Sequence, residues 1–207
     1  MATVIRVLSV DDHPLLRAGI AAIVDDAPDM EVVAQAASGR EAMESFRLHR
    51  PDVTLMDLRL PDIDGIEAMA AIRAGAPEAR VVILTTFEGD VEVHRALASG
   101  ARGYLLKSAA PDEILDSIRQ VHAGRKRIPA EIAATLAEHV ADETITVRER
   151  EVLRLVAEGN RNRDIADVLF LSEDTVKAHV KHIMQKLGAN DRTQAVAIGV
   201  RRGFIQL

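Results

Sequence analysis

The chain has 207 residues, of which 48% are hydrophobic and 28% charged, a balance typical of globular domains that excludes a fibrous or intrinsically disordered protein. It contains no cysteine, which excludes a disulfide scaffold, a thiol nucleophile and cysteine-ligated metal centres. The net charge is −6, but residues 1–124 hold 12 basic and 20 acidic residues (net −8), whereas residues 125–207 hold 14 and 12 (net +2). We therefore expect two domains with different partners, and nucleic acid is a candidate partner only for the second.

The N-terminal segment reaches two acidic residues after a single apolar run of strand length. Nowhere do about 18 uncharged apolar residues follow one another, the length that a membrane-spanning helix needs. We therefore expect a cytoplasmic protein without a signal peptide, a membrane span or a membrane partner.

Residues 1–124 alternate apolar runs of strand length with stretches that have apolar residues three and four positions apart. The strand-like runs are 5–10, 31–36, 53–57, 81–86 and 103–107, and the helix-like stretches are 14–26, 39–49, 64–74, 91–99 and 111–123. Five such alternations predict a parallel sheet with helices on both faces. With right-handed crossovers, the expected α/β fold is a flavodoxin-like doubly wound sheet of order 2-1-3-4-5.

Polar side chains stand where four of these strands end. Asp11 and Asp12 follow the first strand, Asp57 closes the third, Thr85 ends the fourth, and Lys107 ends the fifth. All five lie at the carboxyl edge of the sheet, where open α/β sheets bind ligands. Carboxylates held together there repel one another unless one is protonated or a hard cation intervenes, and oxygen ligands without His or Cys favour Mg²⁺. The sequence therefore predicts a Mg²⁺ site.

Asp57 is the best placed of these carboxylates to attack phosphorus and form an aspartyl phosphate. Lys107 can supply an ammonium for one phosphoryl oxygen, and the Thr85 hydroxyl can donate to another. Each residue taken alone has a plainer interpretation as a turn former, a strand former or a solvated charge. The occurrence of all five polar residues at one edge favours phosphoryl chemistry.

Four segments within residues 3 to about 123 resemble a bacterial two-component receiver domain: VLSVDDHPLLRAGI, LMDLRLPDIDGIEAM, ILTTF and GARGYLLK. The resemblance implies that Asp57 is the phosphoacceptor and that Asp12 and Asp57 bind Mg²⁺ directly. It also implies that Asp11 assists and that the backbone carbonyl of Arg59 completes the protein ligands.

The same resemblance assigns further positions. Thr85 and Tyr104 match the switch pair of the family, in which the hydroxyl turns toward the phosphoryl group and the aromatic ring moves inward. Pro61 and Gly65 would shape the loop after the phosphorylation site. His13 follows the acidic pair, and we expect it to line the rim of the loop rather than bind a metal.

Residues 125–145 are expected to form a linker between a receiver domain, 1–124, and an output domain, 146–207. A linker helix is predicted over about 129–140, because Pro129 suits a first helical turn and Ile132, Leu136 and Val140 recur every four residues. The basic run 125–127 is expected to be a solvated stem rather than a nucleic-acid contact.

The output domain has the pattern of a helix-turn-helix. Thr146 and Glu149 form a capping box for a helix that Gly159 ends after Glu158. Asn162 is expected to cap a short helix that reaches residue 170, and Ser172 a third one. Because only a few residues separate the last two helices, the sequence predicts a helix-turn-helix.

The third helix of this domain has two different faces. Its apolar stripe consists of Val176, Val180, Ile183 and Leu187, at spacings of four, three and four, and Lys177, Lys181 and Gln185 run along another face. One face is therefore expected to be buried, while the other offers charge.

The segment EREVLRLVAEGNRNRDIADVLFLSEDTVKAHVKHIMQKLGANDRTQAV resembles the helix-turn-helix of LuxR-type regulators, and the whole chain resembles a NarL/FixJ-family response regulator. The resemblance implies that the helix with TVKAHVKHIMQKL enters the major groove. The positions that match its DNA contacts are Lys177, Ala178 and Lys181. The final helix, which begins at Asp191 and Arg192, would form the seam of a DNA-bound dimer.

The sequence thus indicates a transcription regulator rather than an enzyme. A sensor histidine kinase would phosphorylate Asp57, the receiver would change shape, and a homodimer would bind promoter DNA, with RNA polymerase a further candidate partner. One alternative is a phosphorylation-independent regulator, which the complete acidic site disfavours.

Two further classes of protein would use such an edge for different chemistry. A Mg²⁺-dependent aspartyl-phosphate phosphatase or phosphotransferase of the haloacid-dehalogenase type would carry an Asp two residues after the nucleophile, where Arg59 stands. A flavodoxin-like FMN carrier is disfavoured because Asp11 and Asp12 would repel the flavin phosphate.

Overall fold

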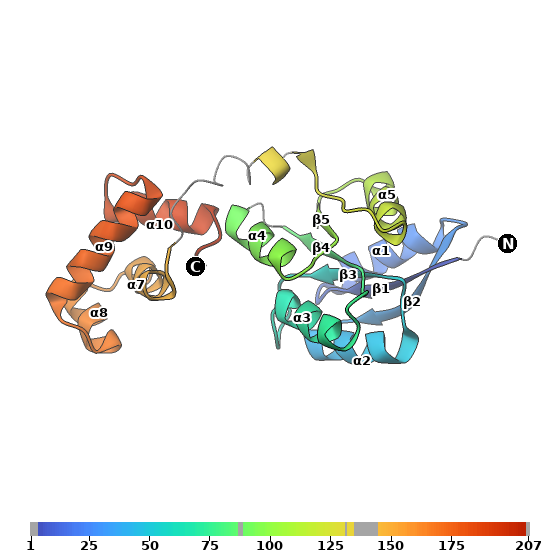
Figure 1. Cartoon of the computed structure of the whole chain (residues 1–207), viewed down its shortest axis with the longest axis horizontal. Helices are drawn as coiled ribbons and strands as arrows, with labels where there is room; N and C mark the ends of the chain where they lie inside the picture. Colours follow the sequence, from blue (N-terminus) through green and yellow to red (C-terminus); the bar gives the residue numbers. More distant parts are fainter. Residues whose placement is uncertain (1–3, 87–88, 131, 135–144, 206–207) are drawn as a thin grey trace. The chain divides into compact units, whose positions relative to one another are not determined.

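The computed structural model describes residues 4–86, 89–130, 132–134 and 145–205. The chain forms two compact units, of which the first comprises residues 1–87 and 93–133 and the second comprises residues 134–207 and the short segment 88–92. In the part of the chain that is described, no helix has the length and apolar character needed to cross a membrane. Figure 1 shows the elements of both units.

The first unit is built on a five-stranded sheet of order β2-β1-β3-β4-β5, in which every neighbouring pair is parallel. The strands are β1 (Ile5–Val10), β2 (Met30–Ala36), β3 (Val53–Asp57), β4 (Val81–Thr85) and β5 (Gly103–Leu106). The predicted doubly wound order is confirmed. The residues of β3 and β4 are buried throughout, as expected for central strands covered on both faces.

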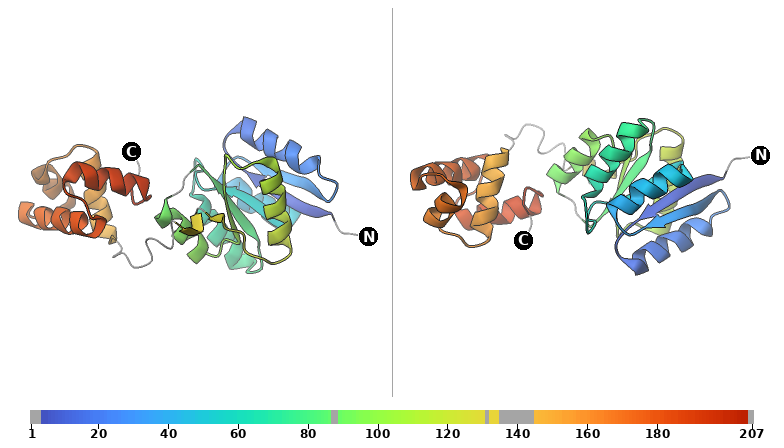
Figure 2. Two further views of the ribbon diagram at one scale, coloured as in Figure 1. Left: turned by 90° about the horizontal axis from the view of Figure 1, so that it is seen from above. Right: turned by 90° about the horizontal axis from the view of Figure 1, so that it is seen from below.

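Five helices accompany the sheet: α1 (Pro14–Asp25), α2 (Gly39–His49), α3 (Gly65–Gly75), α4 (Asp90–Ala98) and α5 (Pro111–His122). Helices α1 and α5 pack together on one face, and α2 and α3 pack together on the other (Figure 2). Local signals fix the starts of these helices: a proline begins α1 and α5, and Ser38 and Asp64 accept hydrogen bonds from backbone N–H groups at the starts of α2 and α3.

The chain leaves α5 by returning to the sheet. The Tyr104 backbone N–H donates to the Arg127 carbonyl at 2.9 Å, and the Arg127 N–H donates to the Arg102 carbonyl at 2.9 Å. The basic run expected as a solvated stem is therefore partly tied to β5 through Arg127. Residues 130 and 132–134 are helical, and the rest of the predicted linker helix lies outside the described residues.

The second unit contains α7 (Val147–Ala157), α8 (Asn162–Leu169), α9 (Glu173–Leu187) and α10 (Arg192–Arg201). The capping box of Thr146 and Glu149 is present, and Ser172 caps α9 as predicted. The predicted cap at Asn162 is wrong by one residue, because Arg161 takes the extended cap position. The Arg161 side chain has no hydrogen-bond acceptor and cannot cap the start of α8. The capping hydrogen bond there is made by Asp164, whose carboxylate accepts the Arg161 N–H at 3.0 Å.

Glu149 joins two helices of this unit as well as capping one. Its carboxylate accepts the Thr146 N–H at 2.8 Å and contacts Lys186 Nζ on α9 at 2.8 Å, and the residue is only 5% exposed. Burial acts to raise the pKa of Glu149, but the Lys186 ammonium and the Thr146 donors outweigh it and hold the pKa below its ordinary value of 4.5.

This depressed pKa makes the second unit sensitive to acid. A carboxylate whose folded pKa lies below the unfolded one contributes stability that is present above pH 4.5 and lost as pH falls through the folded value. Glu149→Gln should therefore lower the free energy of unfolding of this unit by about 1–3 kcal/mol at pH 7. It should also make that free energy less dependent on pH in the acidic range. Hydrogen exchange of α7 and α9 amides at pH 7 and pH 4 measures both effects. Glu151→Gln, at an exposed pair with Arg148, is the control and should change stability by less than about 1 kcal/mol. Equal effects of the two substitutions would show that the contacts of Glu149 with Lys186 and Thr146 do not stabilise this unit specifically.

Candidate functional site

The strand order brings Asp11 and Asp57 together at the carboxyl edge of the sheet. Strands β1 and β3 are neighbours, and Asp11 directly follows β1 while Asp57 is the last residue of β3. Asp11 is 0% exposed and Asp57 is 2% exposed. Asp12 follows with its side chain 37% exposed. Two buried carboxylates and one accessible carboxylate therefore face the same edge.

Lys107 lies between the two buried carboxylates. Its Nζ is 2.7 Å from Asp57 Oδ2 and 2.7 Å from Asp11 Oδ2. Burial raises the pKa of Asp57 despite the hydrogen bond from Lys107. Burial acts to lower the pKa of Lys107, yet the two carboxylates raise it overall. The ammonium therefore stays charged and offsets part of the repulsion between the acids.

The loop after Asp57 is held by close backbone contacts. The Gly65 N–H donates to the Leu58 carbonyl at 2.9 Å, and a Cβ at Gly65 would collide with the Asp57 carbonyl oxygen. No side chain fits there without moving the backbone that carries the phosphoacceptor candidate. The Arg59 N–H donates to Asp57 Oδ1 at 3.1 Å, which orients that carboxylate from within the loop.

Asp62, in the same loop, was not identified from the sequence. Its carboxylate accepts the N–H groups of Gly39 at 2.8 Å and Arg40 at 3.0 Å, at the start of α2, and that of Ile63 at 2.8 Å. Partial desolvation acts to raise its pKa, but these donors together lower the pKa to about 2. Asp62 therefore anchors the loop to a helix start that is distant in sequence.

Arg17 is a second residue that the sequence reasoning missed. It lies in the first turns of α1 and donates from Nη1 to the Asp11 carbonyl at 2.5 Å. Its position in the sequence, a basic residue about one helical turn after the acidic pair, could have indicated a contact with that pair. Its contact fixes the backbone that presents the acidic pair.

Thr85 and Tyr104 lie on neighbouring strands. Thr85 ends β4 and is 1% exposed, and its carbonyl accepts the Lys107 N–H at 2.7 Å. Tyr104 is 0% exposed and pairs with Ile83 in the β4–β5 register. Thr85 therefore lies at the same sheet edge as the acids, while the Tyr104 ring is enclosed within the unit.

The donor set fits a hard divalent cation. One ligand atom from each of Asp11, Asp12, His13 and Asp57 lies within 4.8 Å of the others. The oxygen atoms match the ligand preference of Mg²⁺, and the exposure of Asp12 leaves a route for a cation. His13 was expected at the loop rim, and its side chain is indeed 70% exposed, but its Nδ1 is 2.7 Å from Asp12 Oδ1.

In the second unit, α9 separates its faces as expected. Val176 and Ile183 are buried, whereas Lys177, Ala178 and Lys181 are exposed. Lys177 Nζ lies 3.1 Å from Glu173 Oε1 and 3.2 Å from Asp174 Oδ1, and these hydrogen-bonding carboxylates raise the pKa of Lys177. The three predicted DNA-contact positions thus share a solvent-facing surface.

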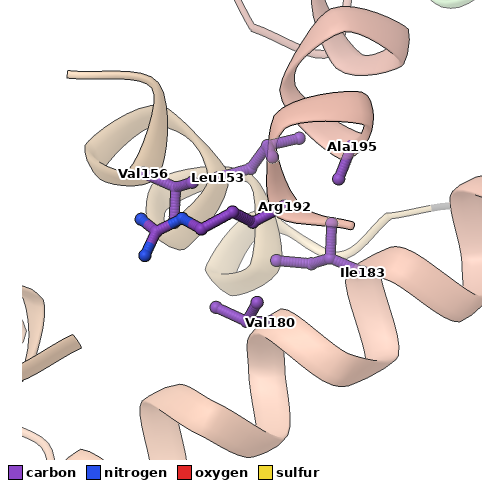
Figure 3. Close-up of a pocket in the computed structure, with 6 residues that line it drawn as sticks. All are labelled: Leu153, Val156, Val180, Ile183, Arg192 and Ala195. Carbon is purple, nitrogen blue, oxygen red and sulfur yellow. The ribbon is translucent and has the colours of Figure 1, made fainter. Parts of the chain in front are cut away.

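A small apolar cavity lies where α9 packs against α7 and α10. It has a volume of about 10 Å³ and is lined by Leu153, Val156, Val180, Ile183, Arg192 and Ala195. Figure 3 shows that these side chains come from α7, α9 and α10, and that the Arg192 guanidinium points away from the space. The buried face of α9 thus packs against two other helices, which orients its opposite face.

Together, a doubly wound sheet with an acidic carboxyl edge and a helix-turn-helix unit define a response regulator with a DNA-binding output domain. Residues 7–119 match the family described as response regulator receiver domain, and residues 143–198 match the bacterial regulatory proteins of the luxR family. The chain belongs to the NarL/FixJ-type response regulators, which combine a receiver domain with a LuxR-type helix-turn-helix.

Known relatives agree over nearly the full length. The chain is 42% identical to the uncharacterized transcriptional regulatory protein YxjL of Bacillus subtilis, over 98% of each chain. It is 39% identical to the response regulator protein VraR of Staphylococcus epidermidis, over 98% of this chain and 99% of VraR.

Solved structures agree as well. ChrA, a response regulator of a heme-sensing two-component system, is 36% identical with a TM-score of 0.59 over 99% of this chain and 100% of ChrA. RcsB in an RcsB–DNA complex is 25% identical with a TM-score of 0.72 over 96% of this chain and 99% of RcsB.

The geometry of the acidic edge predicts how Asp12 affects metal affinity. Asp12→Asn should weaken Mg²⁺ binding by about tenfold or more, because an amide oxygen replaces an anionic ligand. The increase in melting temperature with added Mg²⁺ measures this, since a ligand stabilises the fold that binds it. Asp26→Asn, at an exposed acid that ends α1, should leave the Mg²⁺ response intact. A normal response in Asp12→Asn would show that this carboxylate is no ligand.

Proposed function

We propose that Asp57 accepts a phosphoryl group from a sensor histidine kinase and that this modification controls DNA binding by the second unit. The observation that carries the proposal is the buried Asp57 carboxylate, 2% exposed, with Lys107 Nζ at 2.7 Å. An Asp57 oxygen attacks phosphorus, the bond from phosphorus to the kinase imidazole breaks, and the imidazole keeps the electron pair. Lys107 then holds a phosphoryl oxygen.

Asp12, Asp57 and the Arg59 backbone carbonyl would hold Mg²⁺, and Asp11 would assist. The metal supplies positive charge that neutralises the carboxylates and the incoming phosphoryl oxygens. The cluster of ligand atoms within 4.8 Å supports this assignment. Asp11, which is fully buried, keeps the local charge negative and so favours a cation at this edge.

Thr85 and Tyr104 would transmit the phosphorylated state. The Thr85 hydroxyl turns toward the phosphoryl group, and the Tyr104 ring fills the space behind it. The complete burial of both side chains supports a two-state rearrangement, because a packed core has few intermediate arrangements. The phosphoryl charge would shift the population toward the active state.

The active protein would bind promoter DNA as a homodimer, with α9 in the major groove and Lys177, Ala178 and Lys181 at the DNA surface. The solvent-facing positions of these residues support this role. RNA polymerase is a further candidate partner, and the cytoplasm is the compartment in which such a regulator would work. The dimer would use α10, which begins after Asp191.

Two competing functions have less support. A phosphorylation-independent regulator would have no need for two buried carboxylates and a shared lysine, which cost desolvation energy. An aspartyl-phosphate phosphatase would need an acid or base two residues after Asp57, and Arg59 occupies that position with an exposed side chain.

The purified protein should take phosphate from acetyl phosphate only when Mg²⁺ is present, and Asp57→Asn should abolish labelling. Mass spectrometry detects the added phosphoryl group and its position, and Asp26→Asn is the matched control. Sedimentation and DNA binding, each measured with and without the phosphodonor, then show whether phosphorylation increases dimerisation and DNA affinity. Labelling that persists in Asp57→Asn would refute the phosphoacceptor, whereas normal labelling with unchanged dimerisation and DNA affinity would favour a phosphorylation-independent regulator.

Removal of Lys181 should weaken DNA binding. If the lysine contacts a phosphate, Lys181→Ala should lower the salt slope by about 1 for all sequences; a base contact should cost about 1–3 kcal/mol and relax the preference at one base pair. Lys177→Ala should follow the same pattern with a smaller loss, because Lys177 gives up two intrahelical carboxylate contacts on binding.

Titration against specific and scrambled DNA at several salt concentrations distinguishes the two cases. Arg154→Ala, at an exposed cation on α7, is the control and should keep affinity and slope. If neither lysine substitution changes affinity, slope or preference, α9 does not contact DNA through this face.

A further inference from the structure

We propose that the receiver domain carries a binding site for a small apolar carboxylate, in a hollow between the last turns of α2 and α3. The hollow has a volume of about 330 Å³, and ligand pockets typically measure about 300–1,000 Å³. Its lining includes the apolar residues Met43, Phe46, Ile72 and Gly75 and the two cations Arg47 and Arg50.

The hollow lies at the edge of the sheet opposite the acidic one. Helices α2 and α3 pack side by side on one face of the sheet (Figure 2). Each begins after the carboxyl end of one strand and ends before the amino end of the next strand in the chain. Their last turns therefore lie toward the amino ends of β3 and β4, whereas Asp57 is the last residue of β3. A ligand in the hollow would not occupy the phosphoacceptor.

Small residues on α3 leave the hollow open. Ala71 and Gly75, one helical turn apart, line it together with Met43 and Phe46 of α2. A Cβ added at Gly75 would meet nothing within 4 Å beyond its own helix. Ile72 is 6% exposed and forms a buried part of the lining. The hollow thus offers an apolar surface that the fold itself does not cover.

The two arginines place positive charge beside this apolar surface. Both are exposed, and among the residues that the structure describes neither Arg47 nor Arg50 forms an ion pair with a carboxylate. Asp52, two residues after Arg50, instead accepts the backbone N–H of Arg6 at 2.9 Å. The described residues that line the hollow include no acid. An anion with an apolar body matches this combination of surfaces.

Arg50 stands in a backbone conformation that favours glycine. Its φ of 47° and ψ of 60° are left-handed, the conformation in which helices usually end with glycine. Its N–H donates to the Phe46 carbonyl at 2.9 Å and its carbonyl accepts Arg6 Nη1 at 3.1 Å, and glycine could make both contacts. The helix dipole favours a cation here, but Arg47 in the last turn already supplies one. We therefore assign the Arg50 guanidinium to the hollow.

The ends of the two helices determine which anion fits best. The last carbonyl groups of α2 and α3 place partial negative charge near the hollow, equivalent to about half an elementary charge per helix. This charge disfavours a phosphate dianion more than a monoanion. A guanidinium group also binds a carboxylate in a planar, bidentate geometry. A carboxylate on an aliphatic or aromatic body is therefore the class of ligand that fits both the charge and the lining.

Methyl NMR of the full chain titrated with octanoate tests the proposal. Octanoate should shift the Met43 and Ile72 methyl signals and reach saturation. Octan-1-ol and octyltrimethylammonium, which have the same apolar chain without a negative charge, should bind at least about fivefold more weakly. Octyl phosphate, a dianion at about pH 8, should also bind more weakly than octanoate.

Two arginine variants test the charge. Arg47→Gln and Arg50→Gly should each lower octanoate affinity by about threefold or more. Arg50→Gly should do so without lowering the melting temperature, because glycine suits the left-handed backbone at this position. Arg125→Gln, at an exposed arginine outside the hollow, is the matched control and should leave affinity unchanged.

A filled hollow should not bind the probe. Gly75→Leu should abolish the octanoate-induced shift at Ile72 while the receiver stays folded, because the new side chain has space and leucine favours a helix over glycine. Gly19→Leu, on α1 and also with open space at its Cβ, is the control. Equal binding of octanoate, octan-1-ol and octyltrimethylammonium, unchanged affinity in both arginine variants, or binding that persists in Gly75→Leu would overturn the proposal. Tighter binding of octyl phosphate would overturn the assignment to a carboxylate.

Discussion

The contact on which the acidic edge depends is the pairing of one ammonium with two buried carboxylates. Lys107 Nζ is equally close, at 2.7 Å, to Asp11 and Asp57. Without a cation the two acids would repel each other in a poorly solvated place, and the raised pKa of Asp57 reflects that burial. The edge thus holds Asp57 in an environment that favours positive charge. A metal or a phosphoryl group bound there would change the balance that Lys107 maintains.

The backbone around Asp11, Asp57 and Lys107 is held by contacts that keep Asp57 in place. Gly65 allows the loop to fold directly onto the Asp57 carbonyl, and Asp62 ties the loop to the first N–H groups of α2. Arg17 fixes the other side of the edge through the Asp11 carbonyl. The Asp57 carboxylate itself is oriented by the Arg59 N–H and by Lys107. Because these groups are already in position, they would need little rearrangement during a phosphoryl transfer to Asp57.

Periodicity predicted the sheet well because buried central strands and amphipathic helices have distinct spacings, and the parallel crossovers then restrict the order. The strand-end residues Asp57, Thr85 and Lys107 could be placed at one edge for the same reason. Contacts between distant segments could not be predicted: Asp62 reaches Gly39, 23 positions away, and Glu149 reaches Lys186, 37 positions away. The Asn162 cap failed because Asp164 closes the helix start instead. Spacing along the chain indicates which face a residue occupies, but not its partner on another element.

In α9, residues that contribute to helix formation would also affect the proposed DNA binding. Glu173 and Asp174 occupy the first turn of α9, where negative charge is favoured by the helix dipole, and both also hold Lys177. DNA would have to exchange these contacts for phosphate or base contacts, so Lys177 gains less on binding than its charge suggests. If α9 lies in the major groove, the two acids would also repel nearby DNA phosphates. A DNA site that offers Lys177 a base acceptor would offset this repulsion better than a site that does not.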